Sequence, residues 1–230
     1  MHRDMKGVLL NLLAWLVVIS ALEWTIHKYI MHGDPEALRA IPLIGAWLSK
    51  TAQTHNDHHL DVENDMRIPD HVEKEGLYFS WGSTVPMFAA ATSIMLVANR
   101  TLGGPSVMRT VQTGALLAIV FSLVWNSVHT RMHEYELRIS LIDGVPSLEG
   151  FPQKIGGLYD WMWRNHALHH MQKGSKKGNY NIIVPGFDFL MGTHTDRVYD
   201  NVEYCKNADD KRCLEHKGTH GDVNEMHILR

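Results

Sequence analysis

Three stretches of the chain are rich in large apolar residues and contain no Asp, Glu, Lys or Arg: residues 7–22, 76–99 and 110–130. A membrane-spanning helix needs about 20 mainly apolar residues. Four tryptophans lie near the ends of these runs, where interfacial aromatic side chains gather: Trp15, Trp24, Trp81 and Trp125. The pattern predicts an all-α integral membrane bundle with about three spans, near residues 7–31, 77–99 and 110–130. A soluble helical protein with three buried helices is the alternative.

The polar segments between the apolar runs predict how the chain is oriented. The N-terminus and the link between the second and third runs hold only four of the 22 Lys and Arg residues: Arg3, Lys6, Arg100 and Arg109. Positive charge gathers on the cytoplasmic side of membranes, so residues 33–75 and 131–230 are predicted to be cytoplasmic. Within them, residues 37–50 are too short to span and are expected to form an interfacial helix. We expect one membrane domain over residues 1–199 and a polar tail over 200–230.

Composition narrows the function further. The net charge of −3 gives no reason to expect a nucleic-acid partner. Two cysteines are too few for a secreted disulfide scaffold, and a hydrophobic fraction of 45% excludes wholesale disorder. The abnormal number is histidine, at 16 of 230 residues.

Ten of these histidines form four spaced motifs, HKYIMH, HNDHH, HTRMH and HALHH: His27, His32, His55, His58, His59, His129, His133, His166, His169 and His170. Positions i, i+3 and i+4 share a helix face, so each HxxHH is expected to present three imidazoles to a single point. The HxxxH pair adds two more. The first pair is five residues apart and reaches the same place if the first span ends or bends there.

This pattern favours a metal site. At this histidine content, two HxxHH motifs are expected by chance in well under about 1% of chains of this length. Clustered imidazoles repel one another when protonated and are hard to bury without a partner. Neutral imidazole binds Zn, Fe, Cu and Ni, and ten ligands exceed the needs of one ion, so two ions are expected. The first and third motifs lie at the ends of the first and third predicted spans, on the side where the two HxxHH segments are also predicted, so all ten histidines can meet at one membrane face.

The ordered motifs, together with NYNIIVPGFDFLMGTH at 179–194, resemble the membrane fatty acid hydroxylase/sterol desaturase superfamily, which includes sterol oxidases, sphingolipid hydroxylases and carotenoid hydroxylases. HKYIMHG is most similar to carotenoid hydroxylases. The resemblance covers roughly residues 20–195. It implies two irons held by the ten histidines in a cytoplasmic helical cap, with O2 as co-substrate; zinc is possible on purification. It also implies an external electron donor, such as a ferredoxin, rubredoxin, cytochrome b5 or reductase.

We therefore expect O2-dependent hydroxylation of an aliphatic C–H bond in a lipid-like substrate: a fatty acyl chain, sterol, sphingoid base or carotenoid. A pair of redox metals beside a bilayer fits that chemistry. Desaturation is the close alternative, and a metal-binding or metal-transport membrane protein is the alternative from another class. The expected location is a bacterial inner membrane, with the metal site on the cytoplasmic side.

Four further residues are candidates for supporting roles: Glu23, Asn126, Asp188 and His194. Glu23 is expected to face the protein interior and bond to a ligating histidine, or to snorkel to the interface. Asp188 is expected to orient a histidine or to cap a turn. Asn126 is expected to pack between helices, with a role beside the metal as the alternative. His194 is a reserve ligand.

Three other features could be functional, but each also has a structural explanation or only a weak resemblance to a known site. The spacing of Cys205, Cys213, His216 and His220 is vaguely like that of a zinc site, but no second CxxC accompanies it. His71 favours a solvent or turn position. The aromatic stretch 158–163 is expected to pack in the core or to line a substrate path.

Overall fold

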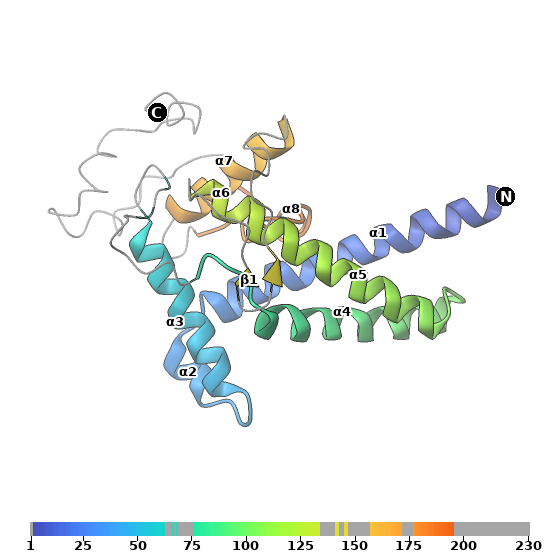
Figure 1. Ribbon diagram of the computed structural model, residues 1–230, viewed down its shortest axis with the longest axis horizontal. Coiled ribbons are helices and arrows are strands. Elements are labelled where there is room, and N and C mark those ends of the chain that lie inside the picture. The colour runs from blue at the N-terminus through green and yellow to red at the C-terminus, as the bar shows by residue number, and fades with distance from the viewer. Residues whose placement is uncertain are drawn as a thin grey trace, which may run out of the picture.

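The computed structural model describes residues 2–62, 66, 68, 76–133, 141–142, 145–146, 157–171 and 177–195. Three long helices run side by side, and the shorter helices gather at one end of them (Figure 1). The first long helix, α1 (His2–Thr25), continues into the π-helix η1 (Ile26–Met31). The second is α4 (Trp81–Leu102). The third is α5 (Val107–Val124), followed by the π-helix η2 (Trp125–His129) and the single turn α6 (Thr130–Met132).

These helices are the predicted membrane spans. Segments Gly7–Met31, Trp81–Leu102 and Val107–Met132 are each long and apolar enough to cross a membrane. Large apolar side chains are exposed along them, including Leu10 at 67% and Val97 at 66%, as expected for surfaces that face lipid rather than water. The prediction of three helices long and apolar enough to span a membrane is therefore confirmed, and these helices indicate an integral membrane protein.

The second span begins at Trp81 instead of near residue 77. The residues before it form a non-helical segment that is buried in the protein, with Leu77 fully buried and Phe79 5% exposed. Asn126 holds this segment, because its side-chain oxygen accepts from the Phe79 N–H at 2.8 Å and its amide donates to the Phe79 carbonyl at 3.3 Å. The apolar pattern alone does not separate a buried extended segment from the start of a span.

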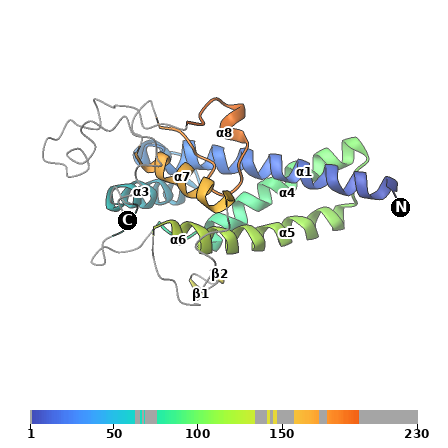
Figure 2. The ribbon, with the colours of Figure 1, turned by 90° about the horizontal axis from the view of Figure 1, so that it is seen from above.

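A tight link joins α4 to α5 at the end of the bundle that holds the N-terminus (Figures 1 and 2). Gly103 ends α4 in the left-handed conformation at φ 69°, which glycine adopts at little cost. The side chain of Asn99 donates to Thr110 Oγ1 at 2.9 Å and accepts from Asn11 at 3.1 Å. One polar network therefore connects all three spans at this end.

The remaining described elements are α2 (Pro35–Arg39), α3 (Gly45–Asp61), α7 (Gly157–Met171), α8 (Phe187–Leu190) and a two-residue antiparallel pair, β1 (Leu141–Ile142) with β2 (Val145–Pro146). The pair matches Leu141 with Pro146. Apart from this pair, the regular elements in the described part of the chain are helices, in agreement with the predicted class.

The interfacial helix expected over residues 37–50 is wrong as a single element. Helix α2 ends at Arg39, and α3 begins at Gly45 after a turn in which Leu43 has φ 69°. A Cβ on Gly45 would collide with the Arg39 carbonyl, so this close approach requires glycine. Helix α3 then runs on to Asp61 and carries the first HxxHH motif.

The hydrophobic core runs between the spans, from Trp15 and Met95 to the end of the bundle where the third span meets α7. It includes Trp125, Val128 and Met132 from the third span. From the aromatic stretch 158–163, Tyr159, Met162 and Trp163 belong to this core, which agrees with the packing role rather than a substrate path. This core fixes α7 against the third span, where Trp163 Nε1 donates to the Met132 carbonyl at 3.2 Å.

Candidate metal centre

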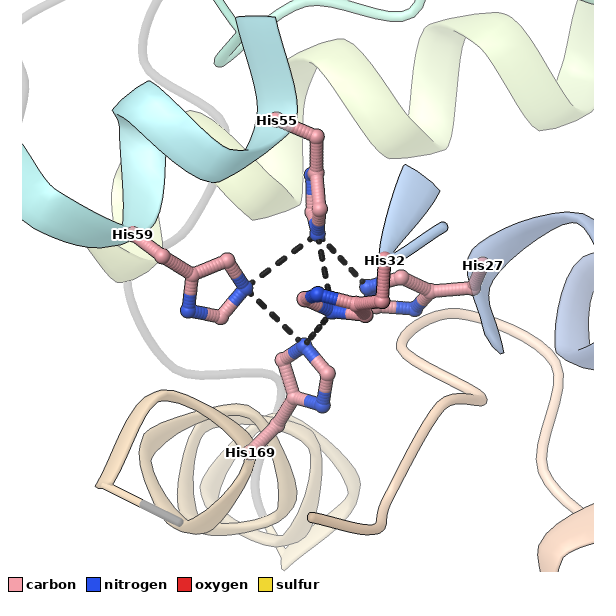
Figure 3. Close-up of side chains that lie close together, drawn as sticks. All are labelled: His27, His32, His55, His59 and His169. Atoms are coloured by element: carbon pink, nitrogen blue, oxygen red, sulfur yellow. Dashed lines mark hydrogen bonds between the residues drawn. The ribbon is translucent and has the colours of Figure 1, made fainter. Parts of the chain in front are cut away.

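The motif histidines meet in two adjacent groups at the site end of the spans. In the first group, one ring nitrogen from each member lies within 4.8 Å of the others (Figure 3): His27, His32, His55, His59 and His169. The second group satisfies the same distance and is fully buried: His58, His129, His133 and His166. The tenth histidine, His170, adjoins the second group, with its Nε2 3.2 Å from that of His166. Among the described residues, both groups consist of histidine alone.

Each HxxHH motif divides between the two groups, which corrects the expectation of three imidazoles aimed at one point. In α3, His55 and His59 join the first group, whereas His58 joins the second. In α7 the assignment is reversed, because His169 belongs to the first group and His166 to the second. Consecutive residues of an α-helix project about 100° apart, so the adjacent histidines of each motif diverge toward neighbouring centres.

The two groups are in contact. The ring of His59 in the first group stacks on that of His170 beside the second group, with centroids 4.0 Å apart, and the ring of His169 in the first group stacks on that of His166 in the second, with centroids 6.1 Å apart. The two HxxHH motifs therefore face each other across one site.

A π-helical turn explains the five-residue spacing of the first motif. The His32 N–H donates to the His27 carbonyl at 3.1 Å, an i to i+5 bond. Residues five apart lie above one another in a π-helix. Accordingly, the rings of His27 and His32 stack with centroids 5.0 Å apart. The first span thus delivers both imidazoles to the first group by widening one turn.

Backbone carbonyls orient four of the imidazoles. Nδ1–H donates in each case to a backbone oxygen: His27 to Tyr180 at 2.6 Å, His129 to Leu77 at 2.8 Å, His133 to Met66 at 2.7 Å and His169 to Gly178 at 2.7 Å. A proton held on Nδ1 leaves the Nε2 lone pair free to bind a metal, which is the arrangement commonly found around metal-ligating histidine. The carbonyls therefore fix both the tautomer and the direction of these rings.

The close approach of the Nε2 atoms shows that a cation suits the first group. Five pairs of Nε2 atoms lie 3.0–3.2 Å apart: His27–His55, His32–His55, His55–His59, His59–His169 and His32–His169. A neutral imidazole carries one N–H, and the carbonyls hold that of His27 and His169 on Nδ1. The other three rings offer at most one proton each, so at least two of the five contacts lack a hydrogen bond and bring together either two lone pairs or two N–H groups. A metal ion among these nitrogens would remove that repulsion.

The imidazoles are held in the neutral form that binds metal. Burial lowers the pKa of His55 well below its usual value, and the neighbouring His32 and His27 lower it further. Burial likewise lowers the pKa of His58, with His133 as the next contribution. Both ring nitrogens of His58 are buried, and neither has a hydrogen-bond partner in the part of the chain that the structure describes. A ligated ion would satisfy a nitrogen that is otherwise costly to bury.

Glu23 neither bonds to a histidine nor snorkels to the surface. It is 4% exposed and accepts backbone N–H groups from the closing segment, by which we mean residues 177–195. Oε1 accepts from Ile182 at 2.9 Å and from Ile183 at 2.8 Å, and Oε2 accepts from Val184 at 2.9 Å. Its carboxylate therefore fixes the closing segment to the first span, and acts on the histidines only through it.

Asp188 acts inside the closing segment and contacts no histidine ring of the site. Its carboxylate accepts the backbone N–H of Tyr180 at 3.1 Å and of Asn181 at 2.6 Å, and the hydroxyl of Thr193 at 2.6 Å. The peptide that carries the Tyr180 carbonyl is thereby held in place for His27. Asp188 thus orients a histidine indirectly.

The other two supporting candidates are also placed. Asn126 packs against the Phe79 backbone as described above, two residues from the Leu77 carbonyl that accepts from His129. His194 belongs to neither histidine group, and its ring lies against Phe189 with centroids 4.0 Å apart. His71, Cys205, Cys213, His216, His220 and the tail over 200–230 lie outside the described residues.

Sequence reasoning quoted residues 179–194 and named Glu23 and Asp188, but it assigned no role to Ser20, Asn165 or Asn181, which also hold the closing segment. Ser20 Oγ donates to the Val184 carbonyl at 2.9 Å and accepts from the Phe187 N–H at 3.0 Å. Asn181 donates to the Ser20 carbonyl at 2.8 Å, and Asn165 of α7 donates to the Asn181 carbonyl at 2.7 Å. The run of polar residues among apolar ones at 179–181 was the available signal.

A scan against protein-family models, a search of curated proteins and a search of solved structures each found no match to the chain, so the family resemblance of its motifs remains a hypothesis.

Proposed function

We propose that this protein is a di-iron membrane oxygenase that hydroxylates an aliphatic C–H bond of a lipid-like substrate with O2. The observation that carries the proposal is the pair of adjacent histidine groups at the end of three membrane spans. Fatty acyl, sterol, sphingoid and carotenoid substrates all have the required aliphatic carbon. Electrons would come from a separate donor of the ferredoxin, rubredoxin, cytochrome b5 or reductase type.

The donor set argues against a structural metal. Structural zinc sites are four-coordinate and use cysteine or mixed cysteine and histidine ligands. The first group offers five imidazoles, and neither group contains cysteine among the described residues. All-nitrogen sets also accept copper, nickel or zinc, so the choice of iron rests on the resemblance of the motifs. Zinc can replace iron during purification.

The chain's own residues have three tasks in this proposal. The imidazoles would hold the ions, with His27 and His169 aimed by backbone carbonyls. The core around Trp125 and Met132 would exclude water from the second group, which is fully buried. When bound, the metal pair would supply the activation of O2, a chemistry that no protein side chain provides.

Two alternatives make different predictions. A desaturase would remove two hydrogens from the same substrate instead of inserting oxygen. A metal transporter would need ligands spread along a path through the spans. In the described part of the chain, both histidine groups lie at one end of the bundle, which favours an enzyme.

The test is product analysis of lipids from cells that make or lack the protein, grown with and without air. Hydroxylation predicts an O2-dependent product 16 mass units heavier than its parent. Desaturation instead predicts a product lighter by two mass units. His58→Ala should abolish the product, whereas the matched variant His194→Ala should retain it. If no O2-dependent product appears while metal flux changes, the transporter alternative is favoured. Fractionation of the same cells tests the proposed bacterial inner-membrane location. Labelling of the histidine-bearing end from either side of that membrane tests whether the metal site is cytoplasmic.

A further inference from the structure

The middle of the closing segment is attached to the first span at residues that precede His27, farther from the histidine end of the bundle. Helix α8 packs against α1. Figure 2 shows α8 beside α1, nearer to the N-terminal end of that span than α3 and α7 are. Ser20 and Trp24 of α1 contact Phe187 of α8, and Glu23 of α1 contacts Ile182, which precedes α8. Trp24 meets Phe187 with ring centroids 5.5 Å apart.

The depth of these contacts follows from helix geometry. The first apolar segment is Gly7–Met31, so Glu23 and Ser20 lie eight and eleven residues before its end. At a rise of about 1.5 Å per residue, that is roughly 12–16 Å inward along the helix. The hydrocarbon core of a bilayer is about 30 Å thick. The 25-residue segment is about 37 Å long and exceeds that thickness by about 7 Å. Even if the whole excess lies at the Met31 end, Glu23 lies about 5 Å and Ser20 about 9 Å inside the hydrocarbon core.

The exposed surface of this part of the chain has the composition of a lipid-facing surface. Between Ile182 and Gly192, every exposed residue is apolar, glycine or proline: Pro185, Gly186, Phe189, Leu190, Met191 and Gly192. Leu190 is 74% exposed and Phe189 56% exposed. The one charged residue in this stretch, Asp188, is 2% exposed and accepts the hydrogen bonds described above. A patch of this kind is unfavourable in water. Helix α8 packs against α1, on which Leu16 and Val17 are also exposed.

The backbone here is irregular, yet many of its N–H groups donate to side chains of the protein. Seven N–H groups of the segment donate to side-chain oxygens of Ser20, Glu23, Asn181 or Asp188: those of Tyr180, Asn181, Ile182, Ile183, Val184, Phe187 and Asp188. Lipid offers no hydrogen bonds, so non-helical backbone at membrane depth persists only where the protein supplies partners. A carboxylate inside an apolar span is costly unless it is paired in this way.

We propose that residues 181–192 form a re-entrant membrane element, whose exposed apolar side chains contact lipid acyl chains beside the first span. Glu23 and Ser20 are the groups that make this entry possible. Phe189, Leu190 and Met191 form the lipid-contacting tip. The proposal depends on the three spans and not on the proposed enzymatic activity.

The test places an environment-sensitive fluorophore on single cysteines in the full chain, with Cys205 and Cys213 replaced by serine, reconstituted in phosphatidylcholine vesicles. Leu190→Cys carries the probe at the tip. Val17→Cys, 61% exposed on the first span, is the lipid reference, and Gln53→Cys, exposed on α3, is the water reference. Brominated phosphatidylcholine quenches from the lipid and iodide from water.

The proposal expects the ratio of bromolipid to iodide quenching at Leu190 to lie closer to the ratio at Val17 than to that at Gln53. A ratio closer to that at Gln53 would overturn it. Protection from both quenchers would also overturn it, because protein, such as a second copy of this chain, would then cover the tip. Met191→Cys, 47% exposed, serves as the second position if the Leu190 variant does not fold.

Discussion

His27 donates its Nδ1 proton to the Tyr180 carbonyl at 2.6 Å, across 153 residues of sequence. This bond ties the end of the first span to the closing segment, and it aims the other ring nitrogen of His27 at His55, 3.0 Å away. The geometry of the first histidine group therefore depends on how firmly the closing segment is held. Glu23, Ser20 and Asp188 hold it through the hydrogen bonds described above.

Glu23→Gln should weaken the attachment of the closing segment to the first span. The glutamine amide has one acceptor oxygen in place of two, and its NH2 group would face backbone N–H groups of residues 182–184. Loss of hydrogen bonds to a charged acceptor costs about 1.5–3 kcal/mol each. We expect a lower thermal unfolding temperature and less bound metal, measured in detergent by fluorescence and metal analysis. Glu36→Gln, on the exposed surface of α2, is the matched control and should change neither. Equal behaviour of the two variants would contradict the assigned role of Glu23.

Asn126→Ala should disturb the second histidine group without touching it. The substitution leaves the Phe79 N–H and carbonyl without this side chain, at a cost of about 1–3 kcal/mol, and frees the neighbouring Leu77 carbonyl that orients His129. The expected result is fewer than two bound metal ions per chain, because the ion in the second histidine group is lost and the ion in the first group is retained. Metal analysis of the purified variant checks it. Retention of both ions would show that His129 needs no such support.

The metal-free protein should lose stability as the pH falls below about 6.5. Burial lowers the folded-state pKa of His55, His58 and His133 well below the usual value, whereas the unfolded chain titrates normally. Protons then bind the unfolded state more strongly, so each such group removes up to about 1.4 kcal/mol per pH unit as the pH drops from its unfolded-state pKa toward its folded-state pKa.

Thermal melts of chelator-treated protein between pH 7.5 and 5.5 test this dependence. The metal-loaded protein should begin to lose stability at a lower pH, because the ion competes with protons for the same nitrogens. A melting temperature that stays constant in the chelated sample would refute the neutral, buried state of these imidazoles.

Asn99→Leu should weaken the far end of the bundle and leave the metal site intact. Asn99 joins Asn11 to Thr110 across the three spans, and interhelical hydrogen bonds of this kind contribute about 0.6–2 kcal/mol each. The variant should unfold at lower denaturant concentration than the wild type yet bind the same amount of metal. Loss of metal from this variant would mean that the two ends of the bundle are coupled.

The spans and the convergence of the motifs could be predicted because they rest on local periodicity. A run of apolar residues fixes a span within a few positions, and spacing along one helix places histidines on one side. The division of each HxxHH between two groups could not be predicted in this way. It depends on α3 and α7 facing each other, so that adjacent residues such as His58 and His59 meet different partners.

The partners of the supporting residues were harder still to foresee. His129 and His133 bond to backbone carbonyls, which every residue carries and which leave no mark in the sequence. Glu23 bonds to amides 159 residues away, so its helical spacing from His27 suggested the wrong partner. Such contacts follow from tertiary structure alone.

The central claim is a two-ion centre built from the ten motif histidines, and its most direct test is the number of metal ions per chain in detergent-purified protein made with ample iron. The account predicts two ions in the wild type and in His194→Ala, and fewer than two in His58→Ala and in His55→Ala. A wild type that binds less than one ion per chain, or binding unchanged by both substitutions in the groups, would contradict it.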